Sequence, residues 1–168
     1  MNSTFTIASD TLHYVTHGGW TGSLSTGSSS WSNYDVRFGV RPSAWASEVD
    51  GLTFAMSGSN RYSLMIVGGN KLVLSKVIAG AETRLASATY AFAGGGWYTL
   101  DASVYQGVLS VKVNSSLVMQ ATDTTLNSGA IAFQANDPVS FDNVVVTQLG
   151  TAPVTSALPP RPSPAARI

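Results

Sequence analysis

Few side chains in this sequence have the types and spacing that catalysis or metal binding requires. The chain has two histidines, His13 and His17, and no Gly-x-Ser-x-Gly motif that would present a serine nucleophile on a sharp turn. Two histidines at this spacing could share a metal ion if they lay on a helix, but Tyr14-Val15-Thr16 between them is typical of a strand or loop. We therefore expect both histidines to face solvent or make hydrogen bonds, and no catalytic residue is assigned.

Aromatic side chains offer a different chemistry, because an exposed ring can pack against the apolar face of a sugar while planar polar groups bind its hydroxyls. Trp20 follows two glycines and Trp45 lies in a segment rich in serine and alanine, so both are expected in loops. Burial within those loops is the alternative for each. Trp31 and Trp97 adjoin predicted strands and are expected to cover the edge of the core. The candidate glycan-binding residues are Trp20, Trp45, Asn60, Arg61 and Tyr62, with Tyr105 at a hairpin tip as a lesser candidate.

Short strands must position these side chains, because apolar residues recur with a period of two along most of the chain. Glycine, serine and asparagine separate the runs, as in Ser57-Gly58-Ser59-Asn60, and such turns join antiparallel strands. No window has a helical period over several turns. Many short strands at regular spacing predict an all-β sandwich or barrel. The alternating runs cover residues 34–41, 52–57, 62–66, 71–78, 97–105, 108–113, 117–119, 130–134 and 140–147.

Composition and charge exclude some classes of partner. Nine basic residues balance nine acidic ones, and only 11% of residues are charged, against about 25% in ordinary soluble domains. We expect no nucleic-acid partner, since no basic stripe could neutralise phosphates. We expect no membrane partner either, since no apolar run approaches about 20 residues. A surface of serine, threonine, asparagine and glycine is typical of extracellular or virion-surface proteins, although residues 1–4 do not resemble a signal peptide. The chain has no cysteine and needs no disulfide.

The composition changes beyond Gly150. Residues 151–168 are rich in proline and have almost no strand pattern, so this stretch is expected to be extended and unable to join a sheet interior. The predicted organisation is one β-sandwich domain over residues 1–150 and an extended proline-rich C-terminal tail over 151–168. The tail is either a linker or an arm that docks on a neighbouring subunit.

Several segments in order carry a family resemblance. They include Trp31-Ser32-Asn33-Tyr34-Asp35-Val36, Gly96-Trp97-Tyr98-Thr99-Leu100 and Phe141-Asp142-Asn143-Val144, with further matches at 51–64, 111–114 and 123–131. Over residues 5–148 the chain resembles the concanavalin-A-like, laminin-G-like jelly rolls that are appended to bacterial glycoside hydrolases. The resemblance implies an antiparallel β-sandwich of two curved sheets, a fold whose members commonly bind sugars. Such modules usually place Asn-Gly where this chain has Asn114-Ser115-Ser116, so we expect a longer loop there than a type I′ turn.

The sugar-hydrolysing relatives of this fold carry Glu-x-Asp-x-Glu or Glu-x-Asp-x-x-Glu, which supplies a nucleophile and an acid on one strand face. Glu48-Val49-Asp50 begins such a motif, but Leu52 and Thr53 stand where the second glutamate is needed. The one other glutamate, Glu82, lies on a different segment. We therefore expect the protein not to be an enzyme.

The resemblance also implies a structural calcium ion. In similar jelly rolls an aspartate of the last strand, which matches Asp142, often helps to bind calcium near the N-terminal strand. Phe141 and Asp142 should point to opposite faces. Either Asp10 or the backbone near Ser9 could complete the site, because calcium prefers carboxylate and carbonyl oxygens. The alternative is that Asp142 only makes hydrogen bonds to backbone at the edge of the sandwich.

Together these patterns predict a lectin-like, non-catalytic module that binds a cell-surface or cell-wall polysaccharide and holds one calcium ion. The alternative is a structural protein of an extracellular assembly, such as a phage capsid decoration protein. In that case residues 151–168 would anchor it to neighbouring subunits.

Overall fold

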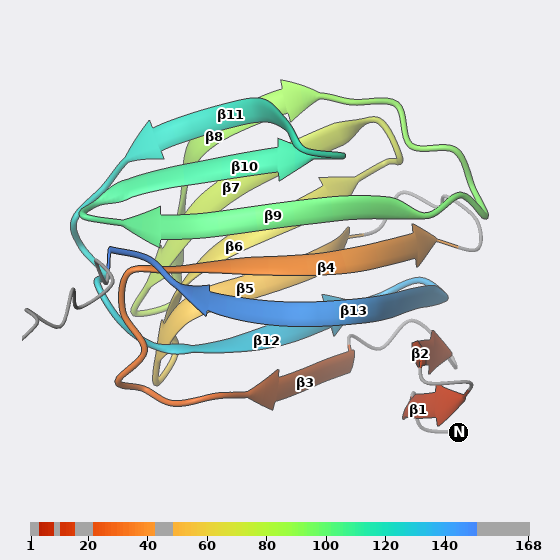
Figure 1. The fold of residues 1–168 in the computed structure, drawn as a ribbon, viewed down its shortest axis with the longest axis horizontal. Coiled ribbons are helices and arrows are strands. Elements are labelled where there is room, and N and C mark those ends of the chain that lie inside the picture. The colour runs from red at the N-terminus through yellow and green to blue at the C-terminus, as the bar shows by residue number, and fades with distance from the viewer. Residues whose placement is uncertain (1–3, 9–10, 16–21, 43–48, 151–168) are drawn as a thin grey trace, which may run out of the picture.

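The computed structural model describes residues 4–8, 11–15, 22–42 and 49–150, and all of the regular elements in these ranges are β-strands (Figure 1). No helix in them is long and apolar enough to cross a membrane. In chain order the strands are β1 (Thr4–Ala8), β2 (Thr11–Val15), β3 (Gly22–Thr26), β4 (Tyr34–Pro42), β5 (Val49–Ser57), β6 (Asn60–Val67), β7 (Lys71–Ile78), β8 (Ala81–Thr89), β9 (Tyr98–Tyr105), β10 (Val108–Val113), β11 (Ser116–Thr122), β12 (Ala130–Ala135) and β13 (Val139–Gln148).

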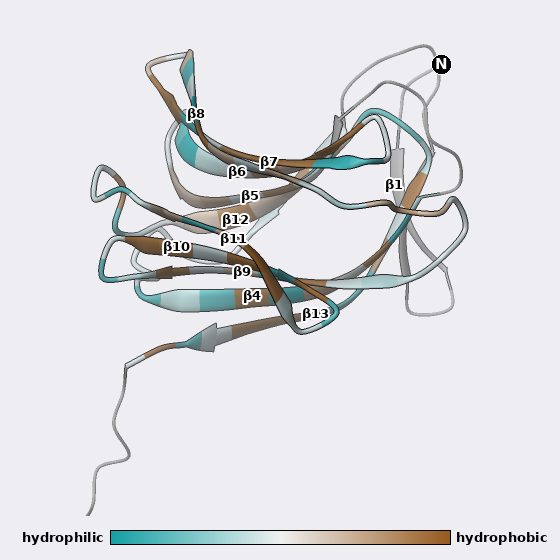
Figure 2. Cartoon of the chain, turned by 90° about the horizontal axis from the view of Figure 1, so that it is seen from above, coloured by the Kyte–Doolittle hydropathy of each residue, from teal (hydrophilic) through white to brown (hydrophobic). Residues whose placement is uncertain are grey.

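The strands form two antiparallel sheets. One has the order β1-β2-β13-β4-β9-β10-β11 and the other the order β3-β12-β5-β6-β7-β8. Viewed from the side, the two sheets lie one above the other (Figure 2). The predicted all-β class and two-sheet sandwich are therefore confirmed. The predicted tail, residues 151–168, lies outside the described residues.

The core lies between the sheets and follows the alternation that the sequence predicts. Tyr34, Val36, Phe38 and Val40 of β4 are all buried. The ring of Phe38 meets that of Phe133 from the other sheet at a centroid distance of 5.3 Å and an interplanar angle of 72°. This edge-to-face contact joins the two layers at the middle of the core.

The alternation predicted for residues 52–57 is interrupted. Leu52 and Phe54 are buried as expected, but Met56 is only partly buried and Ala55 takes the core position. The register with β6 shifts between Phe54 and Ser57, and Ala55 has a φ of 50°. A bulge of this kind adds one residue to the strand, which turns the following side chain to the other face. The prediction that Met56 shares a face with Phe54 was wrong for this reason.

The expectation of a long loop at 114–116 was also wrong. Asn114 and Ser115 have φ values of 48° and 70°, and Val113 pairs directly with Ser116. Two left-handed residues between paired strands form a tight two-residue turn. Asn114 tolerates this conformation, and its Oδ1 accepts a hydrogen bond of 3.0 Å from the Thr99 backbone N–H. The asparagine thereby anchors the turn on the neighbouring strand.

One tyrosine hydroxyl connects the two sheets. Tyr34 Oη donates to the Gly129 carbonyl at 3.0 Å and accepts from the Ala55 N–H at 2.8 Å. Ala55 is the bulged residue of β5, so its N–H is turned out of the sheet pairing and receives this side-chain partner instead. Burial of the hydroxyl raises the pKa of Tyr34 to about 12. The phenol therefore stays neutral at ordinary pH.

We expect Tyr34→Phe to lower the free energy of unfolding by about 2 kcal/mol, because it leaves a buried N–H and a buried carbonyl without a partner. Urea denaturation followed by circular dichroism measures the loss. The raised pKa of Tyr34 also predicts a pH dependence of stability. The stabilisation from this tyrosine is complete below pH 10 and falls as the pH rises from 10 towards 12. A loss below about 0.5 kcal/mol would contradict the structural role of this hydroxyl.

Candidate functional site

The outer face of the six-stranded sheet is hollowed into a groove of about 300 Å³. In Figure 2 one end of β8 rises away from the second layer. The groove is lined by side chains that alternate with the core residues of β6, β7 and β8, together with one from β12. They are Arg61, Ser63, Met65, Val67, Lys71, Val73, Ser75, Val77, Glu82, Arg84 and Gln134. We call this surface the six-strand groove.

Two small hydroxyl side chains, Ser63 and Ser75, line the six-strand groove. The strand register places Thr53 opposite Ser63 and Ser63 opposite Ser75, in one row across β5, β6 and β7. All three are buried although they point away from the core, as is Val73 beside them. Longer neighbouring side chains cover these short ones, as Glu82 covers Ser75 and Met56 covers Thr53. Their hydroxyls can both donate and accept hydrogen bonds.

Charged side chains stand around these hydroxyls. Val77 pairs with Arg61 of β6 on one side and with Glu82 of β8 on the other. Arg84, two residues along β8, lies opposite Ser75. Opposite charges thus stand on β6 and β8, the two strands that flank β7, and line the same face of the sheet.

Two of these charged groups are held in place by hydrogen bonds. Ser75 Oγ lies 2.6 Å from Glu82 Oε1, to which it donates. Arg61 donates from Nη1 to the Ser59 carbonyl at 2.9 Å. Its Nε is buried and has no hydrogen-bond partner among the described residues. A buried N–H without a partner is rare in folded proteins.

The predicted glycan-binding residues have different positions. Arg61 lines the six-strand groove. Asn60 stands at its end, where its Oδ1 accepts from the Ala79 N–H at 2.9 Å and joins two hairpins. Tyr62 was predicted wrongly, because neighbouring residues of a strand point to opposite faces and Tyr62 is fully buried. Trp20 and Trp45 lie outside the described residues.

The predicted calcium ligands are only partly described. Phe141 is buried and Asp142 is partly exposed, so the two point to opposite faces as expected. Asp142 Oδ1 accepts from the Asn143 N–H at 2.7 Å. Asp10 lies outside the described residues, and no group of three metal-binding side chains occurs within those that are described. The calcium site stays a prediction.

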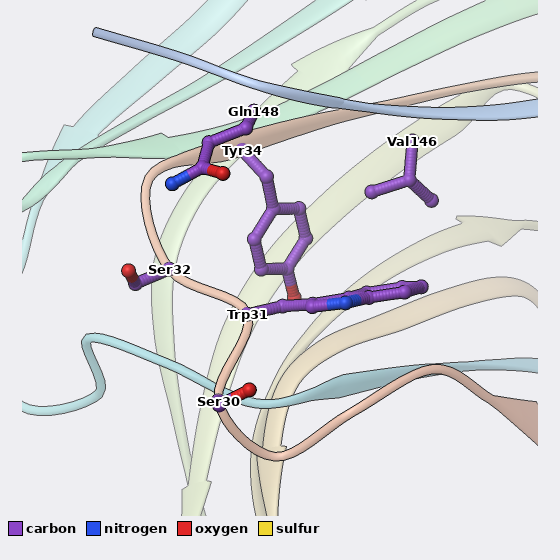
Figure 3. A pocket seen from close by; sticks show the side chains of 6 residues that line it. All are labelled: Ser30, Trp31, Ser32, Tyr34, Val146 and Gln148. Carbon is purple, nitrogen blue, oxygen red and sulfur yellow. The ribbon is translucent and has the colours of Figure 1, made fainter. Parts of the chain in front are cut away.

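The two tryptophans that adjoin strands have different environments. Trp31 packs against the core, as expected, and borders a hollow of about 330 Å³ at the end of the sandwich. Figure 3 shows its ring beneath Tyr34, with Val146 and Gln148 across the hollow. Trp97 does not cover the core edge, because it is 44% exposed on the outer face of the seven-stranded sheet. There the Arg41 guanidinium lies 5.1 Å from its ring centroid.

Glu82 and Arg84 are groove residues that the sequence did not single out. Their strand, β8, has few large apolar residues and no clear alternation, so no strand was predicted there. The usable signal was the turn at Ala79-Gly80 after the predicted strand 71–78, which folds the next residues back beside it. From the sequence, Glu82 was considered only as a possible second catalytic glutamate of a glycoside hydrolase. Its position opposite Val77 depends on the register of β7 with β8, which the sequence does not show.

Comparisons with known proteins agree with this fold. A sequence model of the family described as 3-keto-alpha-glucoside-1,2-lyase-like domain matches residues 11–147. No curated protein sequence is significantly similar to the chain. Among solved structures, the carbohydrate-binding module CBM66 from Bacillus subtilis has a TM-score of 0.74 at 17% identity, and the match covers 86% of this chain and 91% of that one.

Two further solved structures have the same fold. A Bacillus subtilis protein of unknown function with a galectin-like fold has a TM-score of 0.68 at 13% identity, covering 88% of this chain and 87% of that one. Galectin LEC-6 from Caenorhabditis elegans has a TM-score of 0.61 at 13% identity, covering 88% and 96%. These matches confirm the predicted resemblance in fold to concanavalin-A-like, laminin-G-like β-sandwiches. The chain belongs to the family of 3-keto-alpha-glucoside-1,2-lyase-like domains.

Proposed function

We propose that this protein is a non-catalytic carbohydrate-binding module that holds a cell-surface or cell-wall glycan in the six-strand groove. The observation that carries the proposal is the arrangement of Arg61, Glu82 and Arg84 around the buried hydroxyls of Ser63 and Ser75. Binding sites for small polar ligands combine a concave surface with a few fixed polar groups in this way. The fold shared with a carbohydrate-binding module and with galectins supports the proposal.

The charges of the groove suit the hydroxyl groups of a sugar. Glu82 Oε1 already accepts from Ser75, so its other oxygen is left to accept from a ligand hydroxyl. The Arg61 guanidinium can donate to the neighbouring oxygen of the same sugar. Such charge-assisted hydrogen bonds are stronger than neutral ones. The exposed portions of Met65 and Val67 supply apolar surface for the C–H face of the ring.

We expect Arg61→Ala and Glu82→Gln each to weaken glycan binding at least about tenfold, the effect of losing one hydrogen bond to a charged group. The test is a glycan array with the full chain, followed by titration calorimetry on the tightest hit. Arg41→Ala is the matched control, since it removes an arginine from the other sheet. Circular dichroism must show that each variant is folded. Equal affinity in both groove variants and the control would reject the groove as the site.

The family match favours a second candidate, the lyase chemistry named in the family description. A 1,2-elimination from a 3-keto-α-glucoside moves the C2 proton to a base, forms the C1–C2 double bond and expels the C1 oxygen substituent with the bonding electrons. Glu82 is the carboxylate of the six-strand groove that could take the proton. Incubation with a 3-keto-α-glucoside and assay of the released sugar separates the candidates. If the natural protein releases the sugar and Glu82→Gln does not, the lyase function would replace the proposed binding function.

The assembly role predicted as an alternative rests on residues 151–168, and these lie outside the described residues. It stays a prediction, as do the roles of Trp20 and Trp45. If the folded protein binds no glycan on the array and releases no sugar in the lyase assay, the assembly role would be favoured.

A further inference from the structure

The outer face of the seven-stranded sheet carries a second polar surface. A hollow of about 400 Å³ lies among Asp35, Arg37, Asp101 and Lys112. A neighbouring hollow of about 500 Å³ lies beside Tyr105. Ser103 and Leu149 line both hollows, so the two adjoin. We call the combined surface the β9 groove, because β9 supplies Asp101, Ser103 and Tyr105 along its length.

A buried carboxylate marks one end of the β9 groove. Asp101 stands between the inward residues Leu100 and Ala102, so it points to the outer face, yet it is only 3% exposed. Its Oδ1 accepts a hydrogen bond of 2.6 Å from Arg37 Nε. Its Oδ2 is buried and has no hydrogen-bond partner among the described residues. Such an oxygen is costly to leave unpaired, so a hydrogen bond from a water or from a ligand hydroxyl would stabilise it.

The charges around Asp101 select the class of ligand. Arg37 and Asp101 face one another across β4 and β9, and Lys112 stands opposite Asp101 on β10. Asp35 lines the same hollow, and its pKa is raised by burial and by the nearby Asp101 carboxylate. Two acidic and two basic groups therefore balance. An ionic ligand would meet as many like charges as opposite ones, whereas neutral hydroxyls can donate to the carboxylates and accept from the cations.

The other end of the β9 groove has an aromatic platform. Tyr105 is 37% exposed, and its ring lies against Gly150, where an added Cβ would stand 2.8 Å from Cε2. Between Tyr105 and Asp101 lies a row of small polar groups, in which Gln120 Nε2 donates to Ser110 Oγ at 2.9 Å. A tyrosine presents an apolar face and a polar tip together, which suits a sugar ring.

We propose that the β9 groove is a second glycan site, which takes a chain of neutral sugar units between Tyr105 and Asp101. The site lies on the opposite side of the core from the six-strand groove and does not depend on ligand binding there. A sugar hydroxyl donates to Asp101 Oδ2, and Tyr105 stacks on a ring further along the same chain. The exposed side chain of Val145 and that of Leu149 form the apolar wall.

The test is a nuclear magnetic resonance titration of the full ¹⁵N-labelled chain with neutral hexasaccharides of glucose, xylose, mannose, fructose and N-acetylglucosamine. We expect at least one of them to shift the amides of Ser103, Tyr105 and Lys112. These shifts should persist in Arg61→Ala, which alters only the six-strand groove. Asp101→Asn and Tyr105→Ala should each weaken the binding measured from these shifts about tenfold. Leu117→Ala, which trims a 58% exposed residue at the edge of the same sheet, should leave it unchanged.

The outcomes separate the two sites. Shifts confined to the six-strand groove, or no shifts with any of the five hexasaccharides, would overturn the β9 site. Unchanged affinity in folded Tyr105→Ala and Asp101→Asn would also overturn it. Shifts confined to the β9 groove would support the β9 site and reject the six-strand groove as a glycan site. If Asp101→Asn does not fold, Tyr105→Ala decides the result, because the Tyr105 ring is exposed at the surface.

Discussion

Gly129→Ala is expected to lower the free energy of unfolding by about 4 kcal/mol or to prevent folding. Gly129 precedes β12 and has a φ of 153°. A Cβ there would lie 2.2 Å from the Met56 nitrogen and 2.3 Å from the Ala55 carbonyl carbon. Both obstructing atoms belong to backbone in the bulge of β5, so no side-chain rotation can relieve the clash.

The same substitution would also disturb two connections. The Gly129 carbonyl accepts from Tyr34 Oη, and its N–H donates to the Trp31 carbonyl at 2.9 Å. Denaturant unfolding followed by circular dichroism measures the loss. Gly58→Ala is the matched control, because Gly58 has a φ of 61° but no atom within 4 Å of the added Cβ. The control should cost about 1 kcal/mol. Similar losses in the two variants would contradict the steric explanation.

Asp123→Asn is expected to lower the free energy of unfolding by about 3 kcal/mol, since it removes the negative charge from a largely buried ion pair. Lys76 Nζ donates to Asp123 Oδ2 at 2.5 Å. Tyr62 Oη donates to Oδ1 at 2.8 Å, and the Thr125 N–H donates to the same oxygen at 2.9 Å. These bonds hold the connection between β11 and β12 against β6 and β7.

The pH dependence follows from the same contacts. Burial alone would raise the pKa of Asp123, but the hydrogen bonds from Lys76, Thr125 and Tyr62 outweigh it and hold the pKa well below its ordinary value. The stabilisation is therefore complete above pH 3.8, the ordinary value, and is lost as the pH falls below it. The variant should show a smaller loss of stability between pH 5 and pH 2 than the natural protein.

A double-mutant cycle with Lys76→Met isolates the ion pair within this network. We expect a coupling energy of about 1 kcal/mol or more between Lys76 and Asp123, measured by urea denaturation at pH 7. Additive losses, or an unchanged acid transition in Asp123→Asn, would show that the ion pair adds no stability.

The sequence predicted strands well where one face of a strand is buried and the other exposed. In β4 the core residues Tyr34, Val36, Phe38 and Val40 alternate with polar ones, and that alternation follows from the geometry of any strand. β8 was missed because it is an edge strand that lies mostly outside the core, so its residues are not selected for alternating hydrophobicity. Strand pairing could not be predicted, since Tyr34 pairs with Val104 across a long stretch of sequence.

The candidate sites show the same limit. Arg61 was predicted from its residue type, and the fold places it in a groove. Tyr62 was chosen with it, although period-two geometry already assigns adjacent residues to opposite faces. The sequence pattern did not indicate Asp101 as a site residue, because its burial arises from its neighbours Arg37 and Lys112 on two other strands. Residue type indicates what a side chain can do, while its partners are set by pairing between distant segments.

The position of β13 bears on how the protein is synthesised. This strand, the last among the described residues, lies inside the seven-stranded sheet, where it pairs with β2 on one side and β4 on the other (Figure 1). During translation β4 therefore has an open edge until residue 148 has left the ribosome, and β1 and β2 cannot attach to the sheet. Such long-range pairing slows folding and leaves apolar edges exposed to aggregation. Nascent chains that stall before Val139 should accordingly stay unfolded and recruit chaperones.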